Sequence, residues 1–202
     1  MLHRRTLLAC SLALPFGFAQ AASAVGELAP DFALRDANGH DVKLSYFRGK
    51  YVVLEWISPG CPFVRKHYES GNMPATQREA VARGVAWLTM YSDDDTSPHY
   101  TKPARLQAWM RERKAAATAV LVDGNGAVGR AYHARTTLDM YIVSPTGILL
   151  YAGAIDSIPS ADRADIPKAT NYVRQGLTEA LAGRPVSVPV TRPYGCTIQY
   201  KA

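Results

Sequence analysis

The sequence predicts a single α/β domain with a central mixed β-sheet and helices on both faces. The 202 residues suffice for one domain with a full core, and 48% of them are hydrophobic while 20% are charged, as in globular proteins. Apolar runs rich in β-branched and aromatic residues at 51–57, 85–91 and 119–123 predict buried strands. Helical patterns separate these runs, and such alternation favours a sheet with parallel strands at its centre.

The outer elements follow from turn signals and helical spacing. Asn38-Gly39 lies between two alternating runs and predicts an N-terminal β-hairpin over 32–44. Ser144–Gly147 lies between two apolar runs and predicts a second hairpin over 140–152. Helices are expected from Pro62 onward and over 72–84, 102–114, 127–132 and 168–183, with loops at 92–101 and 156–166.

The first 24 residues are predicted to be a secretory signal peptide. Arg4 and Arg5 precede an apolar run, and small residues with Ala-x-Ala exits follow it. The run is too short for an ordinary transmembrane helix. Cleavage would lower the net charge from +6 to +4 and remove Cys10, leaving Cys61 and Cys196 as the two mature cysteines. We therefore expect a periplasmic or secreted protein in a compartment that permits disulfides.

Cys61 is the leading candidate for a reactive residue. It follows the strand at 51–57 and a Ser-Pro-Gly break, and it precedes Pro62, which suits the first position of a helix. Unpaired N–H groups and the helix dipole at such an N-terminus favour a thiolate and lower a thiol's pKa. Arg65 and Lys66 add positive charge one turn on. The alternative is an inert cysteine buried at a strand-to-helix corner.

The second mature cysteine lies in a Pro-punctuated tail, 184–202, which follows a domain that we place at 25–183. Proline and glycine around Cys196 are typical of a segment that can move. Two cysteines in an oxidising compartment form either a permanent structural disulfide or a working redox pair. Tyr194 and Tyr200 flank Cys196, and we expect them to dock the tail onto the domain.

Four segments form a recognisable pattern: Gly26–Phe32, Asp36–Gly39, Arg48–Lys50 and Cys61-Pro62. This pattern resembles the redoxin group, which comprises thioredoxin-like proteins and peroxiredoxins of the alkyl hydroperoxide reductase and thiol-specific antioxidant family. A longer pattern resembles an exported subgroup and comprises Cys61–Tyr68, Gly71–Met73, Gly153–Asp156 and Tyr194–Cys196. The resemblance implies a thioredoxin-like fold with an N-terminal hairpin and an extended C-terminal tail. It also implies a thiol-based oxidoreductase.

The sequence departs from the group's patterns at three positions. Val64 stands where thioredoxins carry the second cysteine of Cys-x-x-Cys. Ser58 stands where peroxiredoxins carry threonine, and its hydroxyl is a candidate hydrogen-bond donor to the thiolate. Leu138 stands where thioredoxin-like folds carry a cis-proline, and we expect a trans bond because a non-proline cis bond costs ~3 kcal/mol. Arg135, three residues out of register, is the nearest candidate for the activating arginine of peroxiredoxins.

Three functional interpretations remain open besides a permanent disulfide staple. In the first, the Cys61 thiolate attacks a peroxide, the sulfenic acid condenses with Cys196, and an unknown thiol reductant restores the pair. In the second, the two cysteines exchange disulfides with other exported proteins. In the third, Cys61, His67 and Met73 bind copper(I), which prefers sulfur ligands. Helical spacing turns His67 away from Cys61, so we expect it at the surface or between helices.

Other partners and motifs carry less weight. We expect no cofactor or resident metal and, because no basic cluster with interleaved aromatic residues appears, no nucleic-acid partner. The sequence leaves open whether Cys196 acts within one chain or across a homodimer. The dinucleotide fingerprint Gly124-x-Gly126-x-x-Gly129 precedes too short a helix, and Asp93–Asp95, without EF-hand spacing, predict a solvated loop. His40, His99 and His133 are expected at the surface, and Trp56 and Trp87 in the core.

Overall fold

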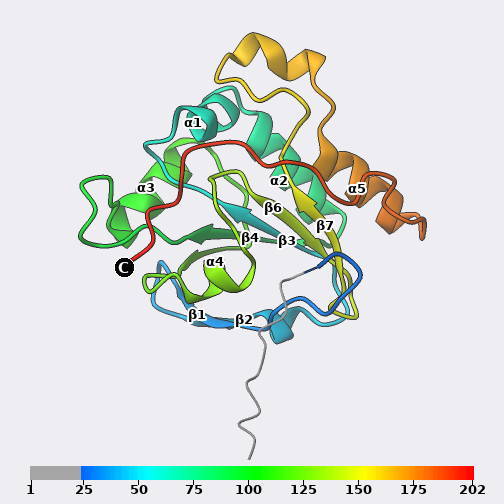
Figure 1. The fold of residues 1–202 in the computed structure, drawn as a ribbon, viewed down its shortest axis with the longest axis horizontal. Coiled ribbons are helices and arrows are strands. Elements are labelled where there is room, and N and C mark those ends of the chain that lie inside the picture. Colours follow the sequence, from blue (N-terminus) through cyan, green and yellow to red (C-terminus); the bar gives the residue numbers. More distant parts are fainter. Residues whose placement is uncertain (1–23) are drawn as a thin grey trace, which may run out of the picture.

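A computed structural model of the chain describes residues 24–202, so all but the last residue of the predicted signal peptide lies outside the described residues. Within this range, seven strands form one mixed sheet in the order β2-β1-β5-β4-β3-β6-β7 (Figure 1). They are β1 (Ala33–Asp36), β2 (Asp41–Lys43), β3 (Val52–Trp56), β4 (Ala86–Tyr91), β5 (Ala119–Val122), β6 (Met140–Val143) and β7 (Leu149–Gly153). The predicted hairpins are β1–β2 and β6–β7, both antiparallel.

β3 lies inside the sheet, parallel to β4 on one side and antiparallel to β6 on the other. All five of its residues are buried, because side chains alternate between two covered faces. Val53 faces a core made with α1 (Pro62–Glu69), α2 (Asn72–Ala82), α3 (Pro103–Glu112) and α5 (Tyr172–Leu181). Trp56 faces a second core with the N-terminal segment and the short α4 (Ala127–Ala131). The sheet is therefore covered on both faces, as predicted, and Trp87 lies in the first core.

The loop predicted at 156–166 is partly wrong, because a 3₁₀ turn, η2 (Arg163–Lys168), begins inside it. The Asp162 carboxylate accepts a hydrogen bond from Ala164 N–H and caps this turn. The helix predicted from residue 168 begins later, at Tyr172, where the Asn171 side chain caps it. A further 3₁₀ turn, η1 (Leu44–Phe47), follows β2. No helix within residues 24–202 is long and apolar enough to cross a membrane.

The tail at 184–202 crosses the domain in contact with it (red in Figure 1). It first contacts α5, where Ser187 N–H donates to the Glu179 carboxylate at 2.8 Å. It then pairs with β7, where Ala152 N–H donates to the Pro189 carbonyl at 3.0 Å and Thr191 N–H donates to the Ala152 carbonyl at 3.1 Å. Farther along, Ile198 is buried in the second core. The division at residue 183/184 stays a prediction, but the main-chain pairing shows that the tail packs on the domain.

Gly129, in the glycine-rich motif, makes room for the tail. A Cβ at Gly129 would collide with the Tyr200 side chain, whose hydroxyl donates to the Ala134 carbonyl at 2.8 Å. The predicted docking of the tail through Tyr200 is therefore confirmed as a contact. The motif serves packing at this point, and the helix that follows it, α4, has only five residues.

Candidate active site

Cys61 is the N-cap residue of α1, and Pro62 occupies the first helical turn, as predicted. β3 brings the chain to this point, and Cys61 N–H donates to the Ser58 carbonyl at 3.0 Å to close the turn. No side chain caps the N–H groups of the first turn of α1, so the positive end of the helix dipole is directed at Cys61. The side chain is almost fully buried, with 3% of its surface exposed.

Cys61 and Cys196 form a disulfide within one chain, with their Cα atoms 5.8 Å apart. The fold thus joins two cysteines that lie 135 residues apart in the sequence. Antiparallel pairing surrounds the bond: Thr137 N–H donates to the Cys196 carbonyl at 2.8 Å, and Ile198 N–H donates to the Arg135 carbonyl at 3.0 Å. The tail therefore reaches the site as an extended segment that forms an isolated antiparallel bridge between Thr136 and Thr197.

Thr137 links the two sulfur-bearing segments, a role that the sequence analysis missed. Its hydroxyl lies 3.1 Å from Cys61 Sγ and donates to it, while Cys196 N–H donates to the same hydroxyl at 3.1 Å. The next residue, Leu138, has φ of +59°, a region that bulky residues rarely adopt. No cis peptide bond occurs in the described chain, so the trans bond expected at Leu138 is confirmed. Its N–H donates to the Trp56 carbonyl at 2.6 Å and ties the loop to β3.

The disulfide borders a cavity of about 210 Å³, here called the disulfide cavity. Its lining comprises Ser58, Gly60, Cys61, Asp93, His99, Cys196, Thr197 and Gln199. Ser58 thus lines the same cavity as the two cysteines, and its hydrogen bond to the thiolate stays a prediction. The solvated loop predicted for Asp93 is wrong, since this carboxyl is buried and accepts a hydrogen bond from Gln199 N–H at 3.1 Å. Burial raises the pKa of Asp93, and hydrogen bonds from Ser58 and Gln199 oppose the rise.

Arg135 contacts the tail and the loop beside the disulfide through its main-chain atoms. Its carbonyl accepts the hydrogen bond from Ile198, and its N–H donates to the Asp139 carboxylate at 3.2 Å. The side chain is exposed and does not line the disulfide cavity. Asp139 is itself buried, and this burial raises its pKa to about 7 despite the Arg135 hydrogen bond. The loop that pairs with the tail is therefore held by a carboxyl group that titrates near neutral pH.

A second buried carboxyl, Glu55 on β3, lies in the first core and was also missed. It accepts hydrogen bonds from Trp87, Tyr68, Gln77 and Thr89 at 2.7–3.2 Å. Burial raises its pKa, and these four donors oppose the rise. The residue lies in an apolar run, and that run gives no sign of the polar partners that the fold brings to it.

The positive charges expected near Cys61 are directed elsewhere. Arg65 pairs with Glu69 at 2.8 Å, and Lys66 is buried with its ammonium 3.9 Å from Asp156. His67 is fully buried, so the surface location is wrong; its Nδ1 lies 2.7 Å from the Asn72 amide at the start of α2, an interhelix contact. Burial lowers the pKa of His67 to about 4, and neighbouring Asp156 only partly opposes this. His40, His99 and His133 are exposed, as predicted.

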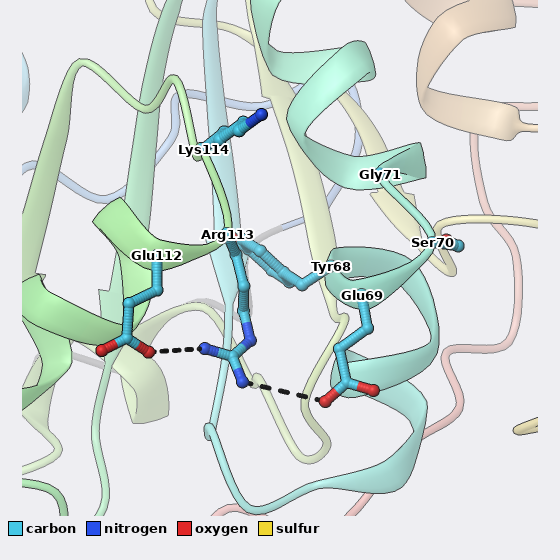
Figure 2. Close-up of a pocket in the computed structure, with 7 residues that line it drawn as sticks. All are labelled: Tyr68, Glu69, Ser70, Gly71, Glu112, Arg113 and Lys114. Carbon is cyan, nitrogen blue, oxygen red and sulfur yellow. Dashed lines mark hydrogen bonds and ion pairs between the residues drawn. The ribbon is translucent and has the colours of Figure 1, made fainter.

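Metal ligands do not gather in the described chain. Residues 24–202 contain no group of three His, Cys, Asp or Glu side chains that could hold a metal ion. Another hollow, of about 590 Å³, lies at the opposite end of α1 from Cys61 (Figure 2). There Arg113 lies between Glu69 and Glu112, at 3.8 and 3.3 Å. These partly exposed ion pairs indicate a polar surface hollow.

Known proteins resemble this chain in sequence and in fold. Residues 25–152 match the model of the AhpC/TSA family. A 66-residue stretch is 33% identical to Peroxiredoxin Bcp of Bacillus subtilis, covering 31% of this chain and 42% of that protein, so the chain matches less than half of this relative.

The structural neighbours extend over more of the chain. A hypothetical protein from Sinorhizobium meliloti gives a TM-score of 0.76 at 24% identity, over 90% of this chain and 97% of its own. The thioredoxin domain of a thiol-disulfide oxidoreductase from Bacteroides vulgatus gives 0.52 at 20% identity, over 72% and 96%. At these identities the likeness concerns the fold alone, and the predicted thioredoxin-like fold is confirmed.

Proposed function

Because the chain belongs to the AhpC/TSA family, we propose that it is a thiol-dependent oxidoreductase with Cys61 as the reactive thiol and Cys196 as its resolving partner. One observation carries the proposal: the disulfide joins Cys61, at the N-terminus of α1, to a cysteine on the tail, and it borders a cavity. A helix N-terminus favours the thiolate once the disulfide is reduced. The cavity offers a small substrate a place beside the sulfur.

The substrate that we propose is a peroxide. The Cys61 thiolate attacks one peroxide oxygen, an S–O bond forms, the O–O bond breaks, and the departing oxygen takes a proton to leave as water or alcohol. The Cys196 thiolate then attacks the sulfenic sulfur, the S–O bond breaks, and the departing hydroxide takes a proton to leave as water while the Cys61–Cys196 disulfide forms. A thiol reductant supplies two electrons and two protons to regenerate both thiols. The match to a peroxiredoxin supports this substrate class.

Two hydroxyl groups are candidates to assist the first step. Thr137 donates to Cys61 Sγ, and Ser58 lines the disulfide cavity beside it. A hydrogen bond to a charged acceptor contributes ~1.5–3 kcal/mol, enough to favour the thiolate over the thiol. The activating role of Arg135 stays a prediction, and its exposed side chain does not line the cavity.

Disulfide exchange with another protein is the second candidate function. The main-chain pairing of Arg135 and Thr137 with the tail favours it, since such bonds can accept any extended peptide in place of the tail. Cys61 thiolate would then attack a partner's disulfide, and Cys196 would release the partner as a thiol. Three expectations remain predictions under both functions: export directed by the segment at 1–24, regeneration by a thiol reductant, and formation of a homodimer.

Peroxide consumption by the reduced chain separates these functions. We expect one equivalent of hydrogen peroxide to be consumed and mass spectrometry to find the Cys61–Cys196 disulfide. Cys196→Ser should consume peroxide but stop at an oxidised Cys61, and Cys61→Ser should consume none. If reduced Cys61 leaves the peroxide intact and yet reduces a disulfide-bonded protein, exchange is the function. If Cys61→Ser keeps full activity in both assays, the proposal fails.

A further inference from the structure

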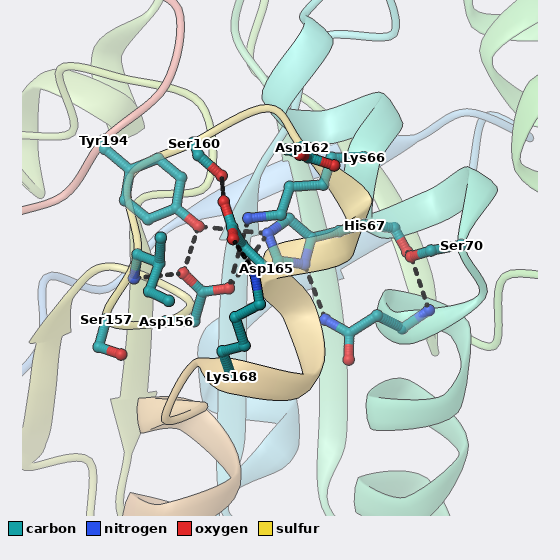
Figure 3. A network of polar contacts seen from close by, with 12 residues as sticks. Lys66, His67, Ser70, Asp156, Ser157, Ser160, Asp162, Asp165, Lys168 and Tyr194 are labelled. Carbon is teal, nitrogen blue, oxygen red and sulfur yellow. Dashed lines mark hydrogen bonds and ion pairs between the residues drawn. The ribbon is translucent and has the colours of Figure 1, made fainter.

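A buried polar cluster fastens the tail two residues before Cys196. It comprises Tyr194, Asp156, His67 and Lys66 and is here called the tail latch (Figure 3). The Tyr194 hydroxyl donates to Asp156 Oδ1 at 2.5 Å and lies 3.2 Å from His67 Nε2. The domain members of the latch are at most 3% exposed, whereas the tyrosine enters from the tail. The contact therefore fixes one point of the tail to the interior of the domain.

Asp156 depends on the tail for one of its hydrogen bonds. Its Oδ1 accepts from Tyr194 and from Ile158 N–H at 3.1 Å, while the Lys66 ammonium stays 3.9 Å from Oδ2. That ammonium has no hydrogen-bond partner among the described residues. Burial, and next the bond to Asp156, raise the pKa of Tyr194 far above its ordinary value, so the hydroxyl stays a donor. A buried carboxylate with few donors holds each of them strongly.

The latch and the sulfur are connected by a single glycine. Gly195 adopts φ of +148°, and a Cβ there would collide with the Thr137 carbonyl oxygen. The Tyr194 ring also packs edge-on against Phe63 of α1, with centroids 5.7 Å apart. Because one tightly packed residue separates the anchored tyrosine from Cys196, holding Tyr194 also holds Cys196 near Cys61.

We propose that Tyr194 is a positioning residue that raises the effective concentration of the Cys196 thiol at Cys61 and thereby sets how readily the disulfide closes. The inference rests on the proposed redox function. Closing the disulfide requires the tail to dock, so a contact that favours docking in the reduced chain shifts the equilibrium toward the disulfide. Removing the hydroxyl should leave the ring against Phe63 and weaken docking alone.

The reduction potential of the pair tests this proposal. The full chain is equilibrated with mixtures of reduced and oxidised dithiothreitol, whose dithiol form gives two electrons and two protons to the disulfide, and free thiols are counted by mass-tagging. We expect Tyr194→Phe to lower the equilibrium constant for disulfide formation about tenfold, which a two-electron couple shows as a rise of about 30 mV. Asp156→Asn, which keeps an oxygen acceptor but loses the charge, should give a smaller rise.

Tyr51→Phe is the matched control, since it removes a hydroxyl that donates to the Ala180 carbonyl at 2.8 Å, outside the tail. We expect it to destabilise the fold without moving the potential. A potential for Tyr194→Phe equal to that of the wild type would overturn the positioning role while leaving the redox function intact. A wild-type pair that does not interconvert reversibly with dithiothreitol would overturn both.

Discussion

Asp139 gives the loop beside the disulfide a pH-dependent stability. Burial raises the pKa of this carboxyl from 3.8 to about 7, so the folded chain binds a proton more tightly than the unfolded chain between these values. Stability must therefore fall as pH rises through this window. A shift of about 3 units at 1.36 kcal/mol each amounts to roughly 4 kcal/mol of stability, which is fully present below about pH 4 and is lost as pH rises to about 7.

Asp139→Asn should remove this pH dependence. The amide oxygen can still accept the Arg135 N–H, so the loop keeps its hydrogen bond. Urea titrations of the oxidised chain give the free energy of unfolding of the variant and of the wild type at each pH. We expect the value for the variant minus the value for the wild type to rise by roughly 4 kcal/mol between pH 4 and 8. Taking the difference isolates Asp139, because every other titrating group is common to both proteins. A difference that stays constant with pH would refute the reasoning.

The variant should also reveal the pH dependence of His67, which has the opposite sign. Burial lowers the pKa of His67 from 6.5 to about 4, so its contribution to stability is present above pH 6.5 and is lost as pH falls toward 4. In the wild type the Asp139 and His67 slopes run in opposite directions and offset each other in part. We therefore expect Asp139→Asn to show a steeper loss of stability on acidification than the wild type.

Two further predictions concern the contacts around the sulfurs. Thr137→Val should slow peroxide-driven disulfide closure about tenfold and Thr137→Ser should restore it, in stopped-flow measurements, because the hydroxyl contacts Cys61 Sγ and Cys196 N–H. Equal rates for both variants would exclude that role. Gly195→Ala should undock the tail and expose Cys61 of the reduced chain to alkylation, whereas Gly124→Ala, where a Cβ meets open space, should leave the rate unchanged. Alkylation of Gly195→Ala at the wild-type rate would contradict the packing argument.

Local patterns in the sequence predict the elements that local forces make. The run at 51–57 is buried on both sides, so continuous hydrophobicity identifies β3, and Pro62 after a turn marks the start of α1. The 3₁₀ turn η2 escapes such reasoning because Pro167 lies inside it and favours a loop. An ion pair between Arg163 and Glu69, which is 94 residues away, joins η2 to α1. A contact of that range leaves no local pattern.

The residues of the candidate site also differ in whether local sequence can predict them. Cys61 can be identified from its neighbours in sequence, whereas Thr137 acts on it from 76 residues away and Tyr194 reaches His67 across 127. Helical spacing correctly turns His67 away from Cys61, but the tail and Asp156 cover that face instead of solvent.

The composition of the tail does not reveal where the tail lies. Its proline and glycine residues suggest a mobile segment, but it docks through main-chain hydrogen bonds, which any residue except proline can donate. Side chains in the tail should therefore tolerate substitution except where one enters the domain, as Tyr194 does at Asp156, or where space allows none, as at Gly195. The position of Cys196 thus depends on the backbone and on these two neighbours more than on the composition of the segment that carries it.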